Sequence, residues 1–214
     1  MLIDFTIRNF MSYRDEVSLS MVASTTVKEC EGNNGTSNVS VIDNNKRILR
    51  TAAIYGANGS GKSTVIAAMD IFKAMTLQSF VDENIVKRLS NLYYHFDTAS
   101  VNEPISMQMI FVWNEERYRY GFETKQGKVL TEWLYVLLKG STKESYCFKR
   151  DGQDIKVNSK VMKGTRGELI KQEAMLDKYK KGGKHLLLVF TSYSIIKLSL
   201  FIDVYLTSSN FFVY

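Results

Sequence analysis

Alternating apolar and polar positions open the chain. The segment Leu2–Arg8 alternates in this way, and a second short run follows from Val17 to Val22. A period of two is typical of half-buried β-strands. The polar residues Ser12 to Glu16 lie between the two runs, so the sequence predicts a hairpin at the beginning of the chain.

The region from Ala23 to Asn45 is mostly polar, with Gly, Asn and Ser in close succession between positions 32 and 38. Such clusters predict a loop without regular structure. The apolar, uncharged run Thr51–Tyr55 follows it and predicts a strand buried on both faces of a parallel sheet.

Helical spacing begins soon after this strand. Apolar side chains recur at Val65, Met69, Phe72 and Met75, while Asp70, Lys73 and Gln78 fall on other faces. The sequence predicts a helix of about five turns starting near Gly61. A second amphipathic helix is expected from Arg166 to Lys181, ended by the glycines at 182 and 183.

An antiparallel β-meander is predicted between these helices. Residues Ile105 to Trp113 alternate, a turn at Asn114–Glu116 follows, and further strands are expected at 118–122, 129–139 and 145–150. The many aromatic residues of this region are expected to form cross-strand pairs that cover a half-buried sheet. The alternative is a platform for stacking nucleic-acid bases.

Composition adds only broad limits. The chain has 214 residues, 45% of them hydrophobic, which suffices for one substantial core. The net charge of +6 permits contact with nucleic acid, and the densest basic stretch is Lys171–Lys184. A solvated helix end is the more ordinary interpretation of that stretch. Two distant cysteines and no leader segment predict a cytoplasmic protein.

The segment with the clearest chemistry is Gly56-Ala57-Asn58-Gly59-Ser60-Gly61-Lys62-Ser63-Thr64. It fits the phosphate-loop pattern G-x-x-x-x-G-K-[ST], and it lies between a predicted strand and a predicted helix, as such a loop must. Backbone N–H groups from Asn58 to Ser63 are expected to surround a β-phosphate, and the ammonium of Lys62 to contact the β- and γ-phosphates. We expect Ser63 to ligate Mg²⁺ and Thr64 to lie on the helix surface or beside a phosphate.

Other candidate residues carry weaker signals. His95 and His185 have no cluster of Cys, Asp or Glu at metal-ligand spacing around them and are expected to be structural or exposed. Glu132 and Asp97 are carboxylates that either face the nucleotide or lie at surface turns, the commoner outcome.

Two segments together resemble a known family. The opening NFMSYRDEVSLSM, from Asn9 to Met21, and the loop IYGANGSGKS, from Ile54 to Ser63, are similar to ATP-binding-cassette-type ATPases related to chromosome-maintenance and recombination proteins. The resemblance is to bacterial AAA-family ATPases of the overcoming-lysogenization-defect and abortive-infection kind, and it covers roughly the first 180 residues. The expected fold is α/β, a phosphate-loop NTPase core with an antiparallel β-meander.

The resemblance implies ATP and Mg²⁺ as cofactors and two heads that enclose two ATP molecules. It also implies a role in phage defence with a nuclease or toxin as effector. Such ATPases need a downstream Leu-Ser-x-Gly signature and an apolar run ending in Asp-Glu. Neither occurs here; the nearest run, Leu198–Asp203, is followed by Val204.

The sequence therefore predicts an ATPase head that is incomplete at its C-terminus. Residues 1–185 are assigned to the head, and residues 186–214 to an apolar tail with three interpretations: a buried pair of elements, a membrane segment, or out-of-frame translation. The two charges of the tail, Lys197 and Asp203, disfavour a membrane segment. The abrupt loss of charge after Lys184 favours the third interpretation.

Several functions compete with ATP hydrolysis. A small-molecule kinase would need an arginine-rich lid, and the sequence contains no such stretch. A GTPase would need an Asn-Lys-x-Asp motif after the loop, which is also missing, and a transporter subunit would require an intact signature. The non-enzymatic alternative is a regulatory or inert fragment that binds a full-length ATPase partner without turnover.

Overall fold

A computed structural model describes residues 1–24, 38–42, 46–78, 82, 84–162 and 211–213. The predicted helix 166–181, the basic stretch 171–184, His185 and residues 186–210 of the tail lie outside these residues. None of the described helices has the length and apolar character needed to cross a bilayer.

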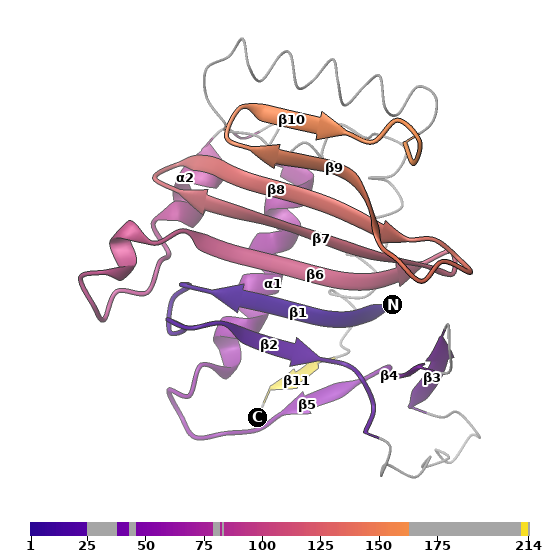
Figure 1. The fold of residues 1–214 in the computed structure, drawn as a ribbon. Helices are drawn as coiled ribbons and strands as arrows, with labels where there is room; N and C mark the ends of the chain where they lie inside the picture. The colour runs from indigo at the N-terminus through magenta and orange to yellow at the C-terminus, as the bar shows by residue number, and fades with distance from the viewer. Residues whose placement is uncertain (25–37, 43–45, 79–81, 83, 163–210, 214) are drawn as a thin grey trace.

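A seven-stranded sheet forms the body of the molecule (Figure 1). Its strands are β1 (Leu2–Arg8), β2 (Val17–Ser20), β6 (Ile105–Trp113), β7 (Glu116–Lys125), β8 (Lys128–Leu137), β9 (Ser145–Asp151) and β10 (Asp154–Val157). The order is β10-β9-β8-β7-β6-β1-β2, and every pair of neighbours is antiparallel. The predicted hairpin and meander are both confirmed, and the pairing of β1 with β6 joins them into one sheet.

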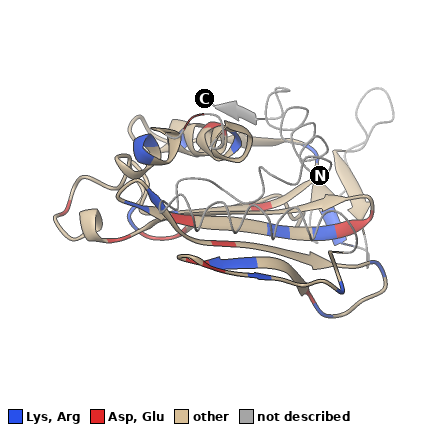
Figure 2. Ribbon diagram, turned by 90° about the horizontal axis from the view of Figure 1, so that it is seen from above, with Lys and Arg blue, Asp and Glu red and all other residues tan. Residues whose placement is uncertain are grey.

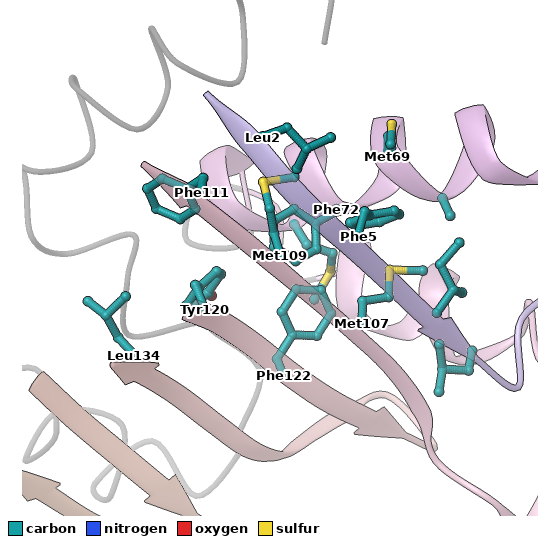
Figure 3. Close-up of a cluster of buried hydrophobic side chains, with 14 of the residues drawn as sticks. Leu2, Phe5, Met69, Phe72, Met107, Met109, Phe111, Tyr120, Phe122 and Leu134 are labelled. Atoms are coloured by element: carbon teal, nitrogen blue, oxygen red, sulfur yellow. The ribbon is translucent and has the colours of Figure 1, made fainter. Parts of the chain in front are cut away.

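Helix α1 (Lys62–Gln78) packs across one face of this sheet, and the short helix α2 (Asn84–Ser90) follows it. The apolar stripe predicted from the sequence is the buried side of α1 and includes Val65, Met69, Phe72 and Met75. Phe72 is fully buried, and its ring lies 5.4 Å from that of Phe122 and 5.5 Å from that of Phe5 (Figure 3). Strands β1, β6 and β7 therefore share one core with α1.

Strand β5 (Ala52–Ile54) leads into the phosphate loop and pairs in parallel with β11 (Phe211–Val213). The parallel pairing agrees with the prediction, but burial on both faces does not. Ala53 is exposed, and Tyr55, just after the strand, is 72% exposed. Within the described part of the chain, β5 has β11 as its only strand neighbour, which leaves much of its surface uncovered.

A second small hairpin, β3 (Val39–Ile42) and β4 (Lys46–Leu49), corrects the prediction of an unstructured loop up to Asn45. The hairpin is anchored by long-range contacts: Ile48 is fully buried, and Leu49 N donates to Met21 O over 2.7 Å. A four-residue strand held by distant partners leaves little local signal in the sequence. Residues 25–37 and 43–45 of that predicted loop lie outside the described residues.

Candidate phosphate-binding loop

The loop lies where the sequence predicts it, between the end of β5 at Ile54 and the start of α1 at Lys62. Gly56 to Ser60 are all exposed. Two glycines have left-handed backbone angles, Gly59 with φ of 80° and Gly61 with φ of 89°. Residues with a Cβ rarely adopt such angles, so the chain can reverse here only because these positions are glycine.

The side chain of Lys62 folds back across the loop. Its Nζ donates to Gly56 O over 2.8 Å and to Ala57 O over 2.9 Å. Two carbonyl oxygens at the start of the loop thus hold the ammonium group in place. An ammonium has three donors, and its charge attracts any anion that enters the loop.

The N-terminus of α1 adds to this positive field. The first turn of α1 contains no acidic residue that would oppose an anion. The first N–H groups of a helix lack intrahelical partners and carry partial positive charge, which is why helix N-termini bind phosphate. One exposed loop therefore combines left-handed glycines, a folded-back lysine side chain and a helix N-terminus.

The turn of the N-terminal hairpin packs against the end of the loop. Tyr13 donates its hydroxyl hydrogen to Gly61 O over 2.8 Å, and Ser12 Oγ lies 2.9 Å from Thr64 Oγ1. Thr64 is only 8% exposed, and its hydroxyl group is paired with Ser12. Sequence reasoning did not assign Ser12 or Tyr13 to the site, although both belong to the opening segment that carries the family resemblance.

Residues 52–160, just over half of the chain, match the family described as "AAA domain, putative AbiEii toxin, Type IV TA system". The chain belongs to this AAA family. Membership implies a P-loop NTPase fold and nucleotide binding of the AAA ATPase type. The match begins at β5 and so contains the whole phosphate loop, α1, α2 and the meander. No curated protein matches the chain.

The two carboxylates singled out in the sequence have other partners in this AAA domain. Asp97 accepts a hydrogen bond from Ser100 N over 2.7 Å and forms an ion pair with Arg14 over 3.0 Å. The hydrogen bond from the Ser100 backbone is the main reason why the pKa of Asp97 is lowered. This carboxylate fastens the loop after α2 to the hairpin turn.

Glu132 is buried, contrary to the expectation of a carboxylate at a surface turn. It is 1% exposed on β8 and accepts a hydrogen bond from the hydroxyl of Tyr120 over 3.0 Å. Its cross-strand partner on β9 is Arg150, which is 3% exposed. Burial raises the pKa of Tyr120 well above its usual value, with a smaller contribution from the charge of Glu132. These side chains form a polar cluster inside the sheet core.

The Mg²⁺ prediction depends on Ser63, whose side chain is exposed in the first turn of α1. Among the described residues, no group of three or more His, Cys, Asp or Glu side chains is placed to hold a metal. A single hydroxyl fits Mg²⁺ only as one ligand beside phosphate oxygens and water, the usual way in which nucleotide sites hold this ion. His95 is exposed, with Nε2 3.2 Å from Asn91 O, in line with a structural role.

Charged side chains occur on several strands of the sheet, and Figure 2 shows blue and red segments near one another there. Arg117 and Arg119 both pair with Glu144, at 3.3 Å and 2.9 Å. The guanidinium of Arg119 also lies 4.1 Å from the ring centre of Tyr135. Glu144 therefore balances one of these two positive charges. Phe111 and Tyr118 are direct partners on β6 and β7, and their rings stack with centroids 5.5 Å apart, which favours the cross-strand interpretation of the aromatic residues over a platform for nucleic acid.

Proposed function

We propose that this chain binds ATP with Mg²⁺ through the loop Gly56–Thr64. The observation that carries the proposal is the position of the Lys62 ammonium, held over a glycine loop at the open N-terminus of α1. Lysine ammonium groups, helix N-termini and consecutive backbone N–H groups are the elements with which proteins hold polyphosphates. The AAA family membership supports the same assignment.

Most residues of the loop have a defined role in this proposal. The backbone N–H groups of Asn58 to Ser63 surround the β-phosphate, and Gly56, Gly59 and Gly61 allow the backbone to approach it. Lys62 exchanges its carbonyl partners for the β- and γ-phosphates, and Ser63 supplies one Mg²⁺ ligand. When bound, Mg²⁺ neutralises charge on the phosphate oxygens.

A finer proposal is that the chain is part of an ATP-binding-cassette-type head of the overcoming-lysogenization-defect kind. The two segments that carry this resemblance, Asn9–Met21 and Ile54–Ser63, are in contact through Tyr13 and Gly61. Phage defence, a head-to-head homodimer, and a nuclease or toxin effector follow from the same resemblance, as does the cytoplasm as compartment. The AbiEii toxin named in the family description is consistent with this context.

The alternative function is a regulatory fragment that binds ATP, or a full-length ATPase partner, without turnover. The contacts of the two carboxylates favour it. Glu132 is hydrogen-bonded to Tyr120 and Asp97 is paired with Arg14, so neither is placed to act as a catalytic base. Turnover measured at high protein concentration separates the two functions. Sustained hydrolysis that is lost with Lys62 would exclude the regulatory fragment.

Calorimetric titration of ATP with Mg²⁺ into the wild-type protein and a Lys62→Ala variant tests the proposal. We expect the variant to lose triphosphate binding, because hydrogen bonds to charged groups contribute about 1.5–3 kcal/mol each and the lysine faces two phosphates. The matched control is Lys128→Ala, which removes an exposed lysine at the start of β8.

Circular dichroism is expected to show that both variants are folded, since Lys62 lies at the surface end of α1. Normal ATP binding by Lys62→Ala would overturn the proposed site. An equal loss of ATP affinity in Lys62→Ala and Lys128→Ala would show that binding depends on the overall charge of the protein rather than on this loop.

A further inference from the structure

We infer that Tyr13 is a positioning residue for polyphosphate binding, acting through the peptide bond between Gly61 and Lys62. The inference rests on the proposed function of the loop. Gly61 O accepts two hydrogen bonds, one from the hydroxyl of Tyr13 over 2.8 Å and one from Thr64 N over 2.9 Å. This carbonyl is therefore fixed from two sides.

Fixing the carbonyl also fixes the N–H group of Lys62. In a planar trans peptide, the C=O and N–H groups of one unit point in opposite directions. The N–H of Lys62 must then point away from Tyr13. It belongs to the first turn of α1, where N–H groups have no intrahelical acceptor. This is one of the groups assigned to the β-phosphate.

The hydrogen bond of Tyr13 has an electronic effect as well. A donor at the carbonyl polarises the peptide unit, so its N–H becomes a stronger donor to an anion. Tyr13 is suited to this role because burial raises the pKa of its hydroxyl, which remains protonated and able to donate. The phenol contacts the backbone of the loop and not the ligand.

A rigid turn holds Tyr13 in this position. Asn9, 2% exposed with a left-handed φ of 53°, donates its side-chain amide to Ser100 O and Glu103 O, both over 2.9 Å. Its Oδ1 accepts from Tyr94 N over 3.1 Å.

The backbone of the turn is also closed on itself. Phe10 and Tyr13 exchange two backbone hydrogen bonds of 2.8 Å, and Met11 N donates to Leu92 O. The phenol of Tyr13 is thus presented to Gly61 from a turn that hydrogen bonds tie at several points to the segment after α2.

The Tyr13→Phe variant removes the hydroxyl and keeps the ring. We expect the Kd values for ATP and for inorganic pyrophosphate, each with Mg²⁺, to rise by the same factor of up to about 10, because the net value of one hydrogen bond is the most that binding can lose when the carbonyl of Gly61 is no longer held. The matched control is Tyr118→Phe, which removes a hydroxyl that donates to Glu116 on β7 over 2.6 Å. Its Kd values are expected to match those of the wild type.

A second readout does not depend on ligand. In ¹⁵N-labelled protein without nucleotide, the Lys62 amide resonance is expected to move in Tyr13→Phe and to stay in place in Tyr118→Phe. Tyr118→Phe is expected to lower the thermal unfolding temperature at least as much as Tyr13→Phe, because its hydroxyl donates to a carboxylate, so a change in Kd confined to Tyr13→Phe does not report a general loss of stability.

The outcomes separate this inference from the proposed function. If the wild type binds ATP, Lys62→Ala does not, and Tyr13→Phe binds as the wild type does, the positioning role is wrong while the function stands. If the wild type binds neither ATP nor pyrophosphate, the proposed function fails and the inference fails with it. A loss of pyrophosphate affinity together with a shifted Lys62 amide supports the positioning role.

Discussion

Substitution of Gly61 by Ala is the sharpest test of how the loop and the hairpin turn fit together. A Cβ at Gly61 would lie 3.0 Å from Ser12 Oγ, 3.0 Å from Tyr13 Oη and 3.1 Å from Tyr13 Cε1. The backbone also has φ of 89°, which costs a non-glycine residue about 1–2 kcal/mol. Displacement of the Tyr13 hydroxyl adds about 1 kcal/mol for the lost hydrogen bond. We expect a total loss of about 2–3 kcal/mol in the free energy of unfolding.

Gly59→Ala is the comparison that isolates the steric part. Gly59 has a similar φ of 80°, but no heavy atom lies within 4 Å of an added Cβ. Gly59→Ala is therefore expected to lower the free energy of unfolding only by the cost of the left-handed backbone angle, about 1–2 kcal/mol. Urea unfolding of both variants, followed by circular dichroism, measures the difference between them.

A double-mutant cycle with Tyr13→Ala completes the test. Removing the tyrosine ring relieves two of the three close contacts of the new Cβ and leaves that with Ser12 Oγ, so Gly61→Ala is expected to cost less in that background, with a coupling of about 1 kcal/mol. Equal losses for Gly59→Ala and Gly61→Ala would refute the reasoning. So would a cost of Gly61→Ala that is unchanged in the absence of Tyr13.

Two further predictions concern the core. Phe72→Ala is expected to lower the free energy of unfolding by about 3–5 kcal/mol, because this fully buried ring contacts Phe5 and Phe122; in urea titration, a change below about 1 kcal/mol would contradict this packing. Burial raises the pKa of the Cys147 thiol to about 12. The contribution of this thiol to the free energy of unfolding is therefore fully present below its usual pKa near 9 and is lost as the pH rises from 9 to 12. Unfolding measured between pH 8 and 11 should show a steeper loss in the wild type than in Cys147→Ala, and parallel curves would contradict the burial of this thiol.

Local patterns predicted most of the elements around the site. Leu2–Arg8 is a strand as predicted, and α1 begins at Lys62, next to the predicted start at Gly61. The alternating segment Ile105–Trp113 forms β6, as predicted. These elements carry their periodicity within the segment itself, and side-chain burial follows that period directly.

Relations between distant segments were not predictable in this way. The pairing of Phe5 with Met109 joins β1 to β6, and no local pattern specifies that partnership. Burial of Glu132 was also missed, because its partner Tyr120 lies on another strand and a single carboxylate in a strand pattern gives no sign of a buried donor. The contact of Tyr13 with Gly61 belongs to the same class, since 48 positions separate the two residues.

The position of β1 between β2 and β6 has a consequence for synthesis on the ribosome. Its partner β6 follows roughly 100 residues later, which at about 5–20 residues per second means that β1 waits on the order of 5–20 s. A two-stranded hairpin such as β1–β2 is marginally stable in water by itself. During that interval β6 is not in place to cover Phe5 and Ile7, both buried in the finished sheet, and α1 can pack against them only after Gln78 has emerged. The nascent chain is therefore most exposed to mispairing and chaperone capture until Trp113, the last residue of β6, has left the exit tunnel.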